Sequence, residues 1–321
     1  MRDPFAFQGK SRRHYFEGWY FKNVAPDGTA YSFIPGVSYD AQGAGHSFVQ
    51  VIRGSDGATA YARYDVDEFS AARNTLDIAV GPNRFSRDGI TVDLPGAFDG
   101  IKGTLTYGPN RRLPRTLLRP GIMGWYRYVP LMECYHEVGS VGHPVAGTLL
   151  AGDEPVDFGA EGGATAGRGY LEKDWGTSMP SAWVWIQGNG FPDPDDSVMI
   201  SIARIPWLGR SFTGFLGFVS AAGRIVQFGT YSGARIVRLD VDGPRVGVSV
   251  QSGPVTIEID GTRTHTGTLA APVGGAMDRR IAESLDSTLR LVVADGGPNA
   301  TEATGGSAGI ELVGDIESLR T

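Results

Sequence analysis

Two carboxylates and a tyrosine alternate along one short segment of this chain. The segment Gly169–Gly176 reads Gly-Tyr-Leu-Glu-Lys-Asp-Trp-Gly. On an extended backbone successive side chains point to opposite faces, so Tyr170, Glu172 and Asp174 share one face. A desolvated carboxyl beside apolar and aromatic neighbours is held in its protonated form near neutral pH. The segment therefore predicts a general acid, with Glu172 as the proton donor assisted by Tyr170.

Asp174 and His136 are candidates for the accompanying base. Each also has a structural interpretation, because an Asp between Lys and Trp-Gly fits a solvated turn that hydrogen-bonds backbone amides. A histidine in an apolar strand can likewise be a satisfied core residue. Both interpretations stay open for both residues.

The next predicted strand begins at Trp183. One of its faces carries Trp183, Trp185 and Gln187, and Asn189 continues that face. A face that runs from two aromatic rings to two amides fits a pocket with an apolar body and a polar end. These four residues are predicted to bind substrate. The alternative is that the tryptophans fill a core.

The first half of the chain carries a similar aromatic and acidic strand in His14–Lys22. Glu17 and Trp19 share a face there and are predicted to contact substrate, since a tryptophan ring can stabilise a cation. The aromatic, turn-rich segment Pro120–His136 is predicted to form a lid, a seam between halves or a plug at the end of a barrel.

Composition excludes several classes of protein. The chain has 321 residues, a net charge of −6 and a single cysteine, Cys134. An acidic chain without a Lys/Arg run has no electrostatic footprint for nucleic acid or for an anionic membrane. One cysteine cannot form an intramolecular disulfide, which fits a reducing compartment. We find no signal peptide and no apolar run of membrane-spanning length, so the protein is expected to be cytoplasmic, with peripheral attachment to a membrane as the alternative.

Several familiar catalytic motifs are absent. The five histidines form no zinc motif, and no strand–glycine–helix unit exists for a dinucleotide. We therefore expect neither a cofactor nor a metal, and general acid–base chemistry in an apolar pocket remains.

The elements that position these residues are predicted to be strands. Short apolar runs recur from Tyr31–Val37 to Ile310–Val313, separated by turn pairs such as Asp27-Gly28, Asp99-Gly100 and Asp260-Gly261. The best short helix candidate is Met277–Leu285. Faint similarity between the halves predicts an all-β chain of two antiparallel β-barrels or curved sheets in tandem. The predicted division is residues 1–152, a glycine-rich linker at 153–167, and residues 168–321.

Several of these segments together resemble the tocopherol cyclase family. They span almost the whole chain: Tyr15–Lys22, Tyr31–Gly36, Met132–His136, Gly169–Trp175, Trp183–Gln187 and Glu283–Asp286. The resemblance implies paired lipocalin-like barrels, distantly similar to carotenoid hydratases and to some lipocalin-like Diels–Alderases. In the hydratases a Tyr-x-Asp element supplies the acid that protonates an alkene. Tyr170-x-Glu172 occupies the matching place, with Glu substituted for Asp.

The activity implied is closure of a prenylated quinol to a chromanol. Glu172 would protonate the prenyl double bond, and a phenol oxygen would close the ring. The chain departs from the plant pattern around Pro114–His143 and in its N-terminus, so the plant substrate is not implied. Water in place of the phenol would make the site a hydratase. The rival interpretation is a non-catalytic carrier of a hydrophobic small molecule.

Overall fold

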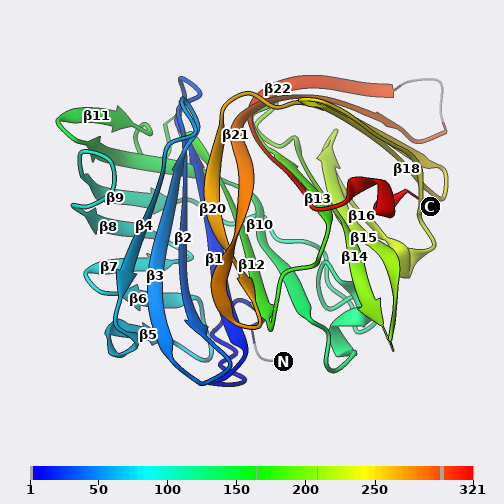
Figure 1. The fold of residues 1–321 in the computed structure, drawn as a ribbon. Helices are drawn as coiled ribbons and strands as arrows, with labels where there is room; N and C mark the ends of the chain where they lie inside the picture. The colour runs from blue at the N-terminus through cyan, green and yellow to red at the C-terminus, as the bar shows by residue number, and fades with distance from the viewer. Residues whose placement is uncertain (1–2, 164, 208, 297–299, 321) are drawn as a thin grey trace. The chain divides into compact units, whose positions relative to one another are not determined.

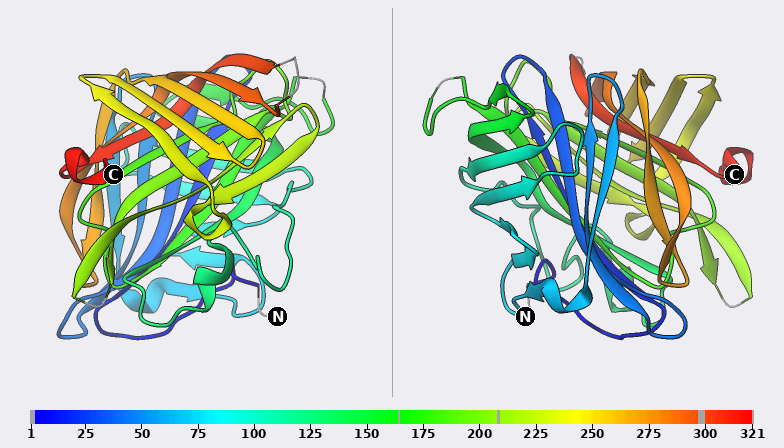
Figure 2. Two further views of the ribbon diagram at one scale, coloured as in Figure 1. Left: turned by 90° about the vertical axis from the view of Figure 1, so that its right-hand side faces the viewer. Right: turned by 60° about the vertical axis from the view of Figure 1, so that its left-hand side comes forward.

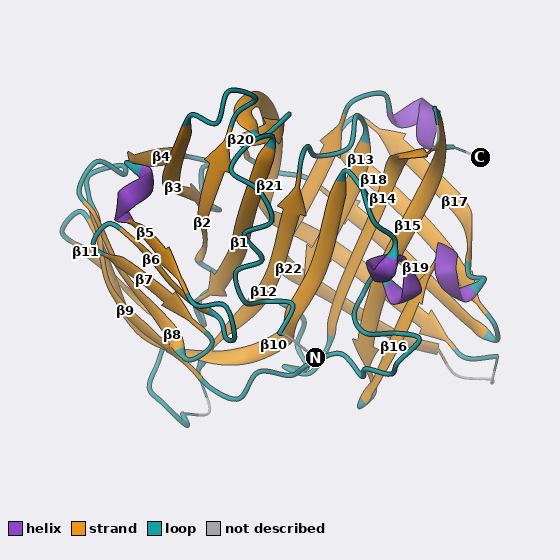
Figure 3. Ribbon diagram, turned by 90° about the horizontal axis from the view of Figure 1, so that it is seen from below, coloured by secondary structure: helices purple, strands orange, loops and turns teal. Residues whose placement is uncertain are grey.

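The computed structural model describes residues 3–163, 165–207, 209–296 and 300–320 and is built from two antiparallel sheets (Figure 1). Helical structure in the described residues is confined to four short 3-10 helices, drawn in purple in Figure 3. They are η1 (Val66–Glu68), η2 (Gly124–Tyr128), η3 (Thr230–Ser232) and η4 (Ile316–Leu319). The predicted all-β class is therefore confirmed. Among the described residues no helix is long and apolar enough to cross a membrane.

The first sheet has the strand order β4-β3-β2-β1-β12-β10-β9-β8-β7-β6-β5, and β11 pairs with β10. Its strands are β1 (Tyr15–Val24), β2 (Ala30–Tyr39), β3 (Gly45–Arg53), β4 (Thr59–Tyr64), β5 (Phe69–Ala71), β6 (Asp77–Val80), β7 (Asn83–Ser86), β8 (Gly89–Leu94), β9 (Ile101–Tyr107), β10 (Cys134–Ala151), β11 (Glu154–Asp157) and β12 (Gly167–Gly176). Almost every neighbour in this order is also a neighbour in sequence. The exception is β12, which lies between β1 and β10.

The second sheet has the order β16-β15-β14-β13-β22-β21-β19-β18-β17, and β20 pairs with β21. Its strands are β13 (Trp183–Gly188), β14 (Ser197–Trp207), β15 (Arg210–Ala221), β16 (Arg224–Gly229), β17 (Arg235–Asp242), β18 (Arg245–Ser252), β19 (Val255–Thr262), β20 (Thr266–Val273), β21 (Ala276–Ala294) and β22 (Ala300–Val313). Figure 2 shows the hairpin strands β17 to β19 in yellow.

Alternating apolar runs form strands as predicted, whereas two local expectations are wrong. The Met277–Leu285 helix candidate lies inside strand β21, because its apolar residues complete a sheet. The Asp260-Gly261 pair lies inside strand β19 instead of a turn. Gly261 is closely packed there, since a Cβ atom at this position would lie 2.8 Å from Ile310 Cδ1.

The chain divides into two compact units, and each unit is assembled from segments that are not consecutive in the sequence. Unit 1 comprises Met1–Arg112, Cys134–Met179 and Gly267–Ile281, and unit 2 comprises Leu113–Glu133, Pro180–Thr266 and Ala282–Thr321. This division differs from the predicted one, because residues 168–176 belong to strand β12 of the first sheet. Local periodicity identifies a strand but not the sheet that takes it up, since pairing partners can be distant in sequence.

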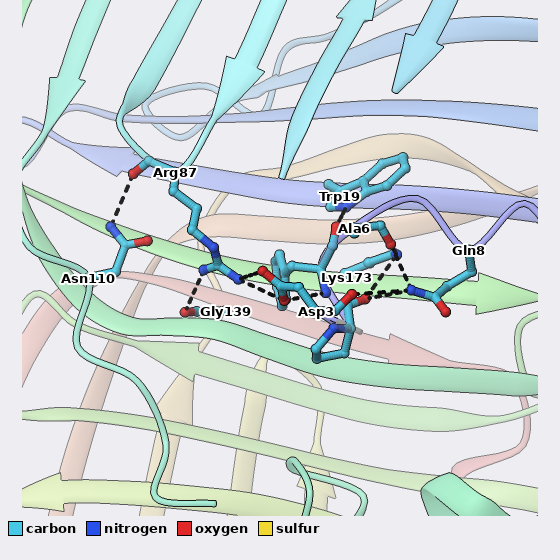
Figure 4. A network of polar contacts seen from close by, with 10 residues as sticks. Asp3, Ala6, Gln8, Trp19, Arg87, Asn110, Gly139 and Lys173 are labelled. Carbon is cyan, nitrogen blue, oxygen red and sulfur yellow. Dashed lines mark hydrogen bonds and ion pairs between the residues drawn. The ribbon is translucent and has the colours of Figure 1, made fainter. Parts of the chain in front are cut away.

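The apolar core of unit 1 includes Phe5, Trp19, Phe21 and Leu171. Phe5 of the N-terminal segment packs in this core. Figure 4 shows the polar contacts that hold the N-terminal segment in place. Lys173 Nζ donates hydrogen bonds to the carbonyl oxygens of Pro4 (3.1 Å) and Ala6 (2.8 Å). Asp3 forms an ion pair with Arg87 at 2.9 Å.

The hairpin formed by β20 and the start of β21 is also part of unit 1. Gln50 Nε2 donates to the Ala270 carbonyl at 3.0 Å, and the Ser38 hydroxyl donates to the Gly275 carbonyl. Unit 2 has its own apolar core, which includes Val184, Ile186 and Ile200.

Candidate acid–base site

Strand register places His136 next to two carboxylates. In the antiparallel pairing of β10 with β12, His136 lies opposite Asp174, and Val138 lies opposite Glu172. Directly opposed residues of antiparallel strands point to the same face. The side chains of His136, Glu172 and Asp174 therefore meet on one face of the first sheet, and Tyr170 shares it by strand alternation.

The four side chains form a continuous polar chain. The Tyr170 hydroxyl donates a hydrogen bond to Glu172 Oε2 at 2.7 Å. The same oxygen lies 3.6 Å from His136 Nε2, and the opposite ring nitrogen, Nδ1, lies 2.9 Å from Asp174 Oδ1. The two ring nitrogens thus each face a carboxylate, with Asp174 at hydrogen-bond distance and Glu172 at ion-pair distance. Asp174 therefore fixes the ring orientation, and a proton can pass between His136 and Glu172 once they approach to hydrogen-bond distance.

Electrostatics favour a protonated imidazole in this chain. Burial alone would lower the pKa of His136, but the negative charges of Asp174 and Glu172 and the hydrogen bond to Asp174 outweigh burial and raise its pKa to about 9. Burial and the neighbouring Glu172 charge raise the pKa of Tyr170 well above its ordinary value. At neutral pH the cluster therefore holds one exchangeable proton on His136 and a neutral tyrosine.

The cluster lies on the sheet face opposite the apolar core of unit 1. Leu171 alternates with Tyr170 and Glu172 and belongs to that core. Beside Asp174 on strand β1 stands Gly18, where an added Cβ atom would meet nothing closer than 3.9 Å. Beside Glu172 stands Tyr20. Tyr170 and Glu172 are buried, whereas Asp174 is half-buried, so the open side of the cluster lies at Asp174 and Gly18.

The same side chains could hold a cation. Ligand atoms of His136, Glu172 and Asp174 all lie within 4.8 Å of one another. An imidazole and two carboxylates suit a divalent transition metal, which would replace the proton on the histidine. A search of the sequence for zinc motifs misses this grouping, because the ligands come from two strands in different parts of the chain.

Sequence reasoning also missed Cys134. Its sulfur lies 3.7 Å from Asp174 Oδ1 and 3.8 Å from Met179 Sδ. The spacing of two residues between Cys134 and His136 on strand β10 was the available signal, since it places both side chains on one face.

Glu17 and Trp19 lie on the other face of the first sheet, inside unit 1. Glu17 forms an ion pair with Lys173 at 2.5 Å and accepts hydrogen bonds from the amides of Gln8 (2.7 Å) and Gly9 (3.0 Å). Trp19 Nε1 donates to the Phe5 carbonyl at 2.9 Å. Both predicted substrate contacts therefore have buried protein partners. Lys173, which the sequence placed between two acids, points away from them and anchors this network.

The predicted substrate face of strand β13 lies in unit 2. Trp183, Trp185, Gln187 and Asn189 are all buried, and they alternate with the core residues Val184 and Ile186. Trp183 Nε1 donates to Glu311 Oε2 at 2.5 Å.

Register adds two carboxylates that sequence reasoning did not assign to this face. Glu311 lies opposite Trp185 on strand β22, and Glu283 lies opposite Glu311 on strand β21. The face is therefore aromatic, amide-bearing and acidic, and it is separate from the apolar core of its own unit.

Comparisons with known proteins identify the fold. No family model matches the chain, and no curated protein matches it. A structure assigned as AttH (NE1406) from Nitrosomonas europaea matches with a TM-score of 0.55 at 15% identity, covering 97% of this chain and 96% of that one. CghA with Sch210972 matches with a TM-score of 0.57 at 14% identity, covering 95% of this chain and 90% of that one. At these identities the likeness shows a shared lipocalin-like fold.

Proposed function

We propose that this protein is a cofactor-independent, acid–base cyclase that acts on a prenylated quinol or a related isoprenoid substrate. The observation that carries the proposal is the chain Tyr170–Glu172–His136–Asp174, whose members lie within hydrogen-bond or ion-pair distance of one another. The fold supports it, since CghA, which shares that fold, has been crystallised with the compound Sch210972. The resemblance of the sequence motifs to tocopherol cyclases supports the choice of substrate class.

The reaction needs one proton in and one proton out. Transfer of the proton from His136 Nε2 to Glu172 Oε2 turns the imidazolium–carboxylate pair into a neutral imidazole and a carboxylic acid. Glu172 then protonates the alkene, whose π electrons form the new C–H bond and leave a tertiary cation. The phenol oxygen attacks this cation, and its proton passes to His136 or Asp174. Substrate and product have the same formula. The cluster ends in its starting state once the proton is on His136 Nε2, which needs one further transfer where Asp174 is the first acceptor.

Acid catalysis supplies only part of the acceleration. A positioned proton donor contributes about 10²–10⁴-fold. Holding the prenyl chain near the phenol oxygen removes much of the entropic cost of ring closure. The arrangement of Asp174 against His136 adds orientation, because a carboxylate at one ring nitrogen fixes the proton on that side and leaves the other nitrogen for exchange.

The decisive experiment is incubation with a prenylated benzoquinol in deuterated water, followed by chromatography and mass spectrometry. Cyclisation gives a product of unchanged formula that carries one non-exchangeable deuterium. A hydratase on the same residues would add the elements of water instead. We expect Glu172→Gln to bind the quinol but to lower turnover about 10²–10⁴-fold, because the amide cannot donate an acidic proton.

Glu302→Gln is the matched control, since Glu302 is an exposed carboxylate of unit 2 that pairs with Arg290. It should cyclise the quinol at the wild-type rate. Wild-type turnover by Glu172→Gln would remove Glu172 from the acid role, and recovery of unlabelled quinol from the wild-type protein would reject the cyclase.

A non-catalytic carrier is the second candidate, and the tryptophan face of unit 2 favours it. Trp183 and Trp185 offer ring faces, and Gln187 and Asn189 offer amides at one end, as a site for a largely apolar ligand would. A carrier should retain an unreacted lipid through purification, and Trp185→Ala should reduce the amount retained. Binding without deuterium incorporation would favour the carrier over the cyclase.

A further inference from the structure

Unit 2 presents an aromatic and aliphatic surface from the segment Leu113–Glu133. Five large hydrophobic side chains of this segment are exposed, and we call them the Leu-Trp patch. Their exposed fractions are 79% for Leu117, 77% for Leu118, 46% for Trp125, 56% for Tyr128 and 99% for Leu131. Four other large hydrophobic residues are exposed in the described chain, and they are scattered from Tyr61 to Val273. Scattered exposure is ordinary, whereas five such side chains within the fifteen residues from Leu117 to Leu131 mark a candidate interaction surface.

The segment holds the two leucines at the tip of a tight turn. Reciprocal backbone hydrogen bonds join Thr116 and Arg119, with N–O distances of 2.9 and 3.2 Å. Leu117 and Leu118 are the two residues between them. The Tyr128 hydroxyl donates to the Leu117 carbonyl at 3.0 Å, which ties the turn to η2. The turn is therefore held by hydrogen bonds, and its two leucine side chains are exposed to solvent.

The base of the segment is anchored within unit 2. Gln227 Nε2 donates to the Pro114 carbonyl at 3.1 Å. Gly124, with φ of +56°, packs so closely on the Tyr231 ring that an added Cβ atom would lie 2.4 Å from it. Leu131 has φ of +63°, a conformation that a leucine rarely adopts. The backbone thus fixes the base while it exposes the apolar side chains.

Charge identifies the partner. The segment Leu113–Glu133 contains three arginines (Arg115, Arg119 and Arg127) and one acidic residue, Glu133, in a chain with a net charge of −6. Arg115 and Arg119 flank the leucine tip. Projecting leucines with an aromatic belt and flanking cations suit the interface of an anionic bilayer, where apolar groups enter the acyl boundary and cations meet the headgroups. A search of the sequence for Lys/Arg runs misses this surface, because the arginines are spaced among apolar residues.

We propose that the Leu-Trp patch docks this protein on the surface of an anionic lipid bilayer. Insertion of Leu117 and Leu118 supplies the apolar part of the binding, and Arg115 and Arg119 supply the part that depends on lipid charge. The patch is distinct from the acid–base residues of unit 1, so this inference stands whether or not the protein is a cyclase.

Cosedimentation with vesicles tests the proposal directly. One set of vesicles is made of phosphatidylcholine alone, and the other contains phosphatidylglycerol as well. We expect the wild-type chain to bind the second set, and to bind it less as ionic strength rises. The double variant L117S/L118S should lower the partition coefficient about 10- to 100-fold, because two leucines no longer enter the apolar layer.

A charge variant and a matched apolar control complete the design. The variant R115Q/R119Q should lose about fivefold in binding for each arginine, and only on the anionic vesicles. The control Val237→Ser removes another exposed apolar side chain of unit 2, on strand β17, and should bind as the wild type does. Thermal melts of all variants check that the fold is retained.

Two results would overturn the proposal. The first is a wild-type chain that binds neither set of vesicles, or an L117S/L118S variant that still binds as tightly as the wild type. The second is a wild-type dimer, seen by light scattering, that L117S/L118S makes monomeric while neither protein binds vesicles. In that case the Leu-Trp patch would cover a second copy of the chain.

Discussion

At the scale of the residue, one short segment directs its acidic and its basic side chains to opposite faces of the first sheet. Glu172 and Asp174 lie with His136 on one face of the first sheet, whereas Lys173 points into unit 1 and pairs with Glu17. A buried ammonium group is costly unless it is paired and hydrogen-bonded. Glu17 and the carbonyls of Pro4 and Ala6 meet this requirement for Lys173. The acids on the other face are thereby left to act on one another and on His136.

The charge of His136 predicts how activity responds to pH. Because the pKa of His136 is raised to about 9, its proton is present at neutral pH and is lost as pH rises through about 9. Turnover in the cyclase assay should fall along this alkaline limb. His46 and His143, whose pKa values burial lowers to about 4 and about 3, are uncharged there and cannot produce it. A pH–rate profile of the wild type and of His136→Gln checks the assignment, with the exposed His265→Gln as control.

The same shift predicts a stability change. A group whose pKa is raised from 6.5 to about 9 on folding stabilises the folded state fully below pH 6.5, and this contribution disappears as pH rises through about 9. Its size is on the order of 3 kcal/mol. The free energy of unfolding, measured by urea denaturation, should fall more between pH values below 6.5 and above 9 in the wild type than in His136→Gln. Equal losses in the two proteins would contradict a raised pKa.

At the scale of the element, the N-terminal segment behaves as part of the first sheet's core. Phe5 is fully buried, and a Cβ atom at Gly139 would lie 2.4 Å from its ring. The amides of Gln8 and Gly9 donate to Glu17, which in turn pairs with Lys173. The segment therefore contributes both apolar packing and the partners of a buried ion pair.

Removal of residues 1–9 should destabilise the protein by at least the roughly 3–5 kcal/mol that loss of a buried phenylalanine costs. Lys173→Met in the full chain removes the same ammonium–carbonyl contacts and leaves Glu17 as a buried charge, so it should also be strongly destabilising. Because the two changes share these contacts, their effects should not add, and a double-mutant cycle by urea denaturation measures the coupling. Simple additivity would show that Lys173 and the segment act independently.

At the scale of the whole molecule, chain order and spatial grouping differ. Strand β12 pairs with β1 and β10, although some 140 residues separate β1 from it along the chain. The segment Leu113–Glu133 lies between strands β9 and β10 of unit 1, yet it belongs to unit 2. The predicted division at residues 152–168 would separate β12 from both of its partners.

Fragments of the chain test this grouping. A fragment of residues 1–166 lacks β12 and should show no cooperative thermal unfolding, because β1 and β10 each lose a pairing edge in the middle of the sheet. A fragment of residues 1–179 retains β12, although it lacks the Gly267–Ile281 segment of unit 1, and should show a transition by circular dichroism. Cooperative unfolding of the shorter fragment would support the division predicted from the sequence.

The sequence alone determined the local features of this protein. Alternation along a strand is a property of the backbone, so the shared face of Tyr170, Glu172 and Asp174 and the polar end of the Trp183–Asn189 face could be predicted. Most of the strands and the turns at Asp27-Gly28 and Asp99-Gly100 follow from the same local chemistry.

Only the tertiary structure decided which residues meet. The register of β10 against β12 places His136 opposite Asp174, and two irregularities in that pairing follow at Val138–Ser140 and Ser140–His143. Neither register nor the choice of neighbouring strand is encoded in a local pattern, because a strand can pair with any edge that its apolar face fits. The pairing of Glu17 with Lys173 and the exposure of Leu117 and Leu118 arise in the same way. They depend on which distant segments cover a side chain, and that is settled only when the whole chain packs.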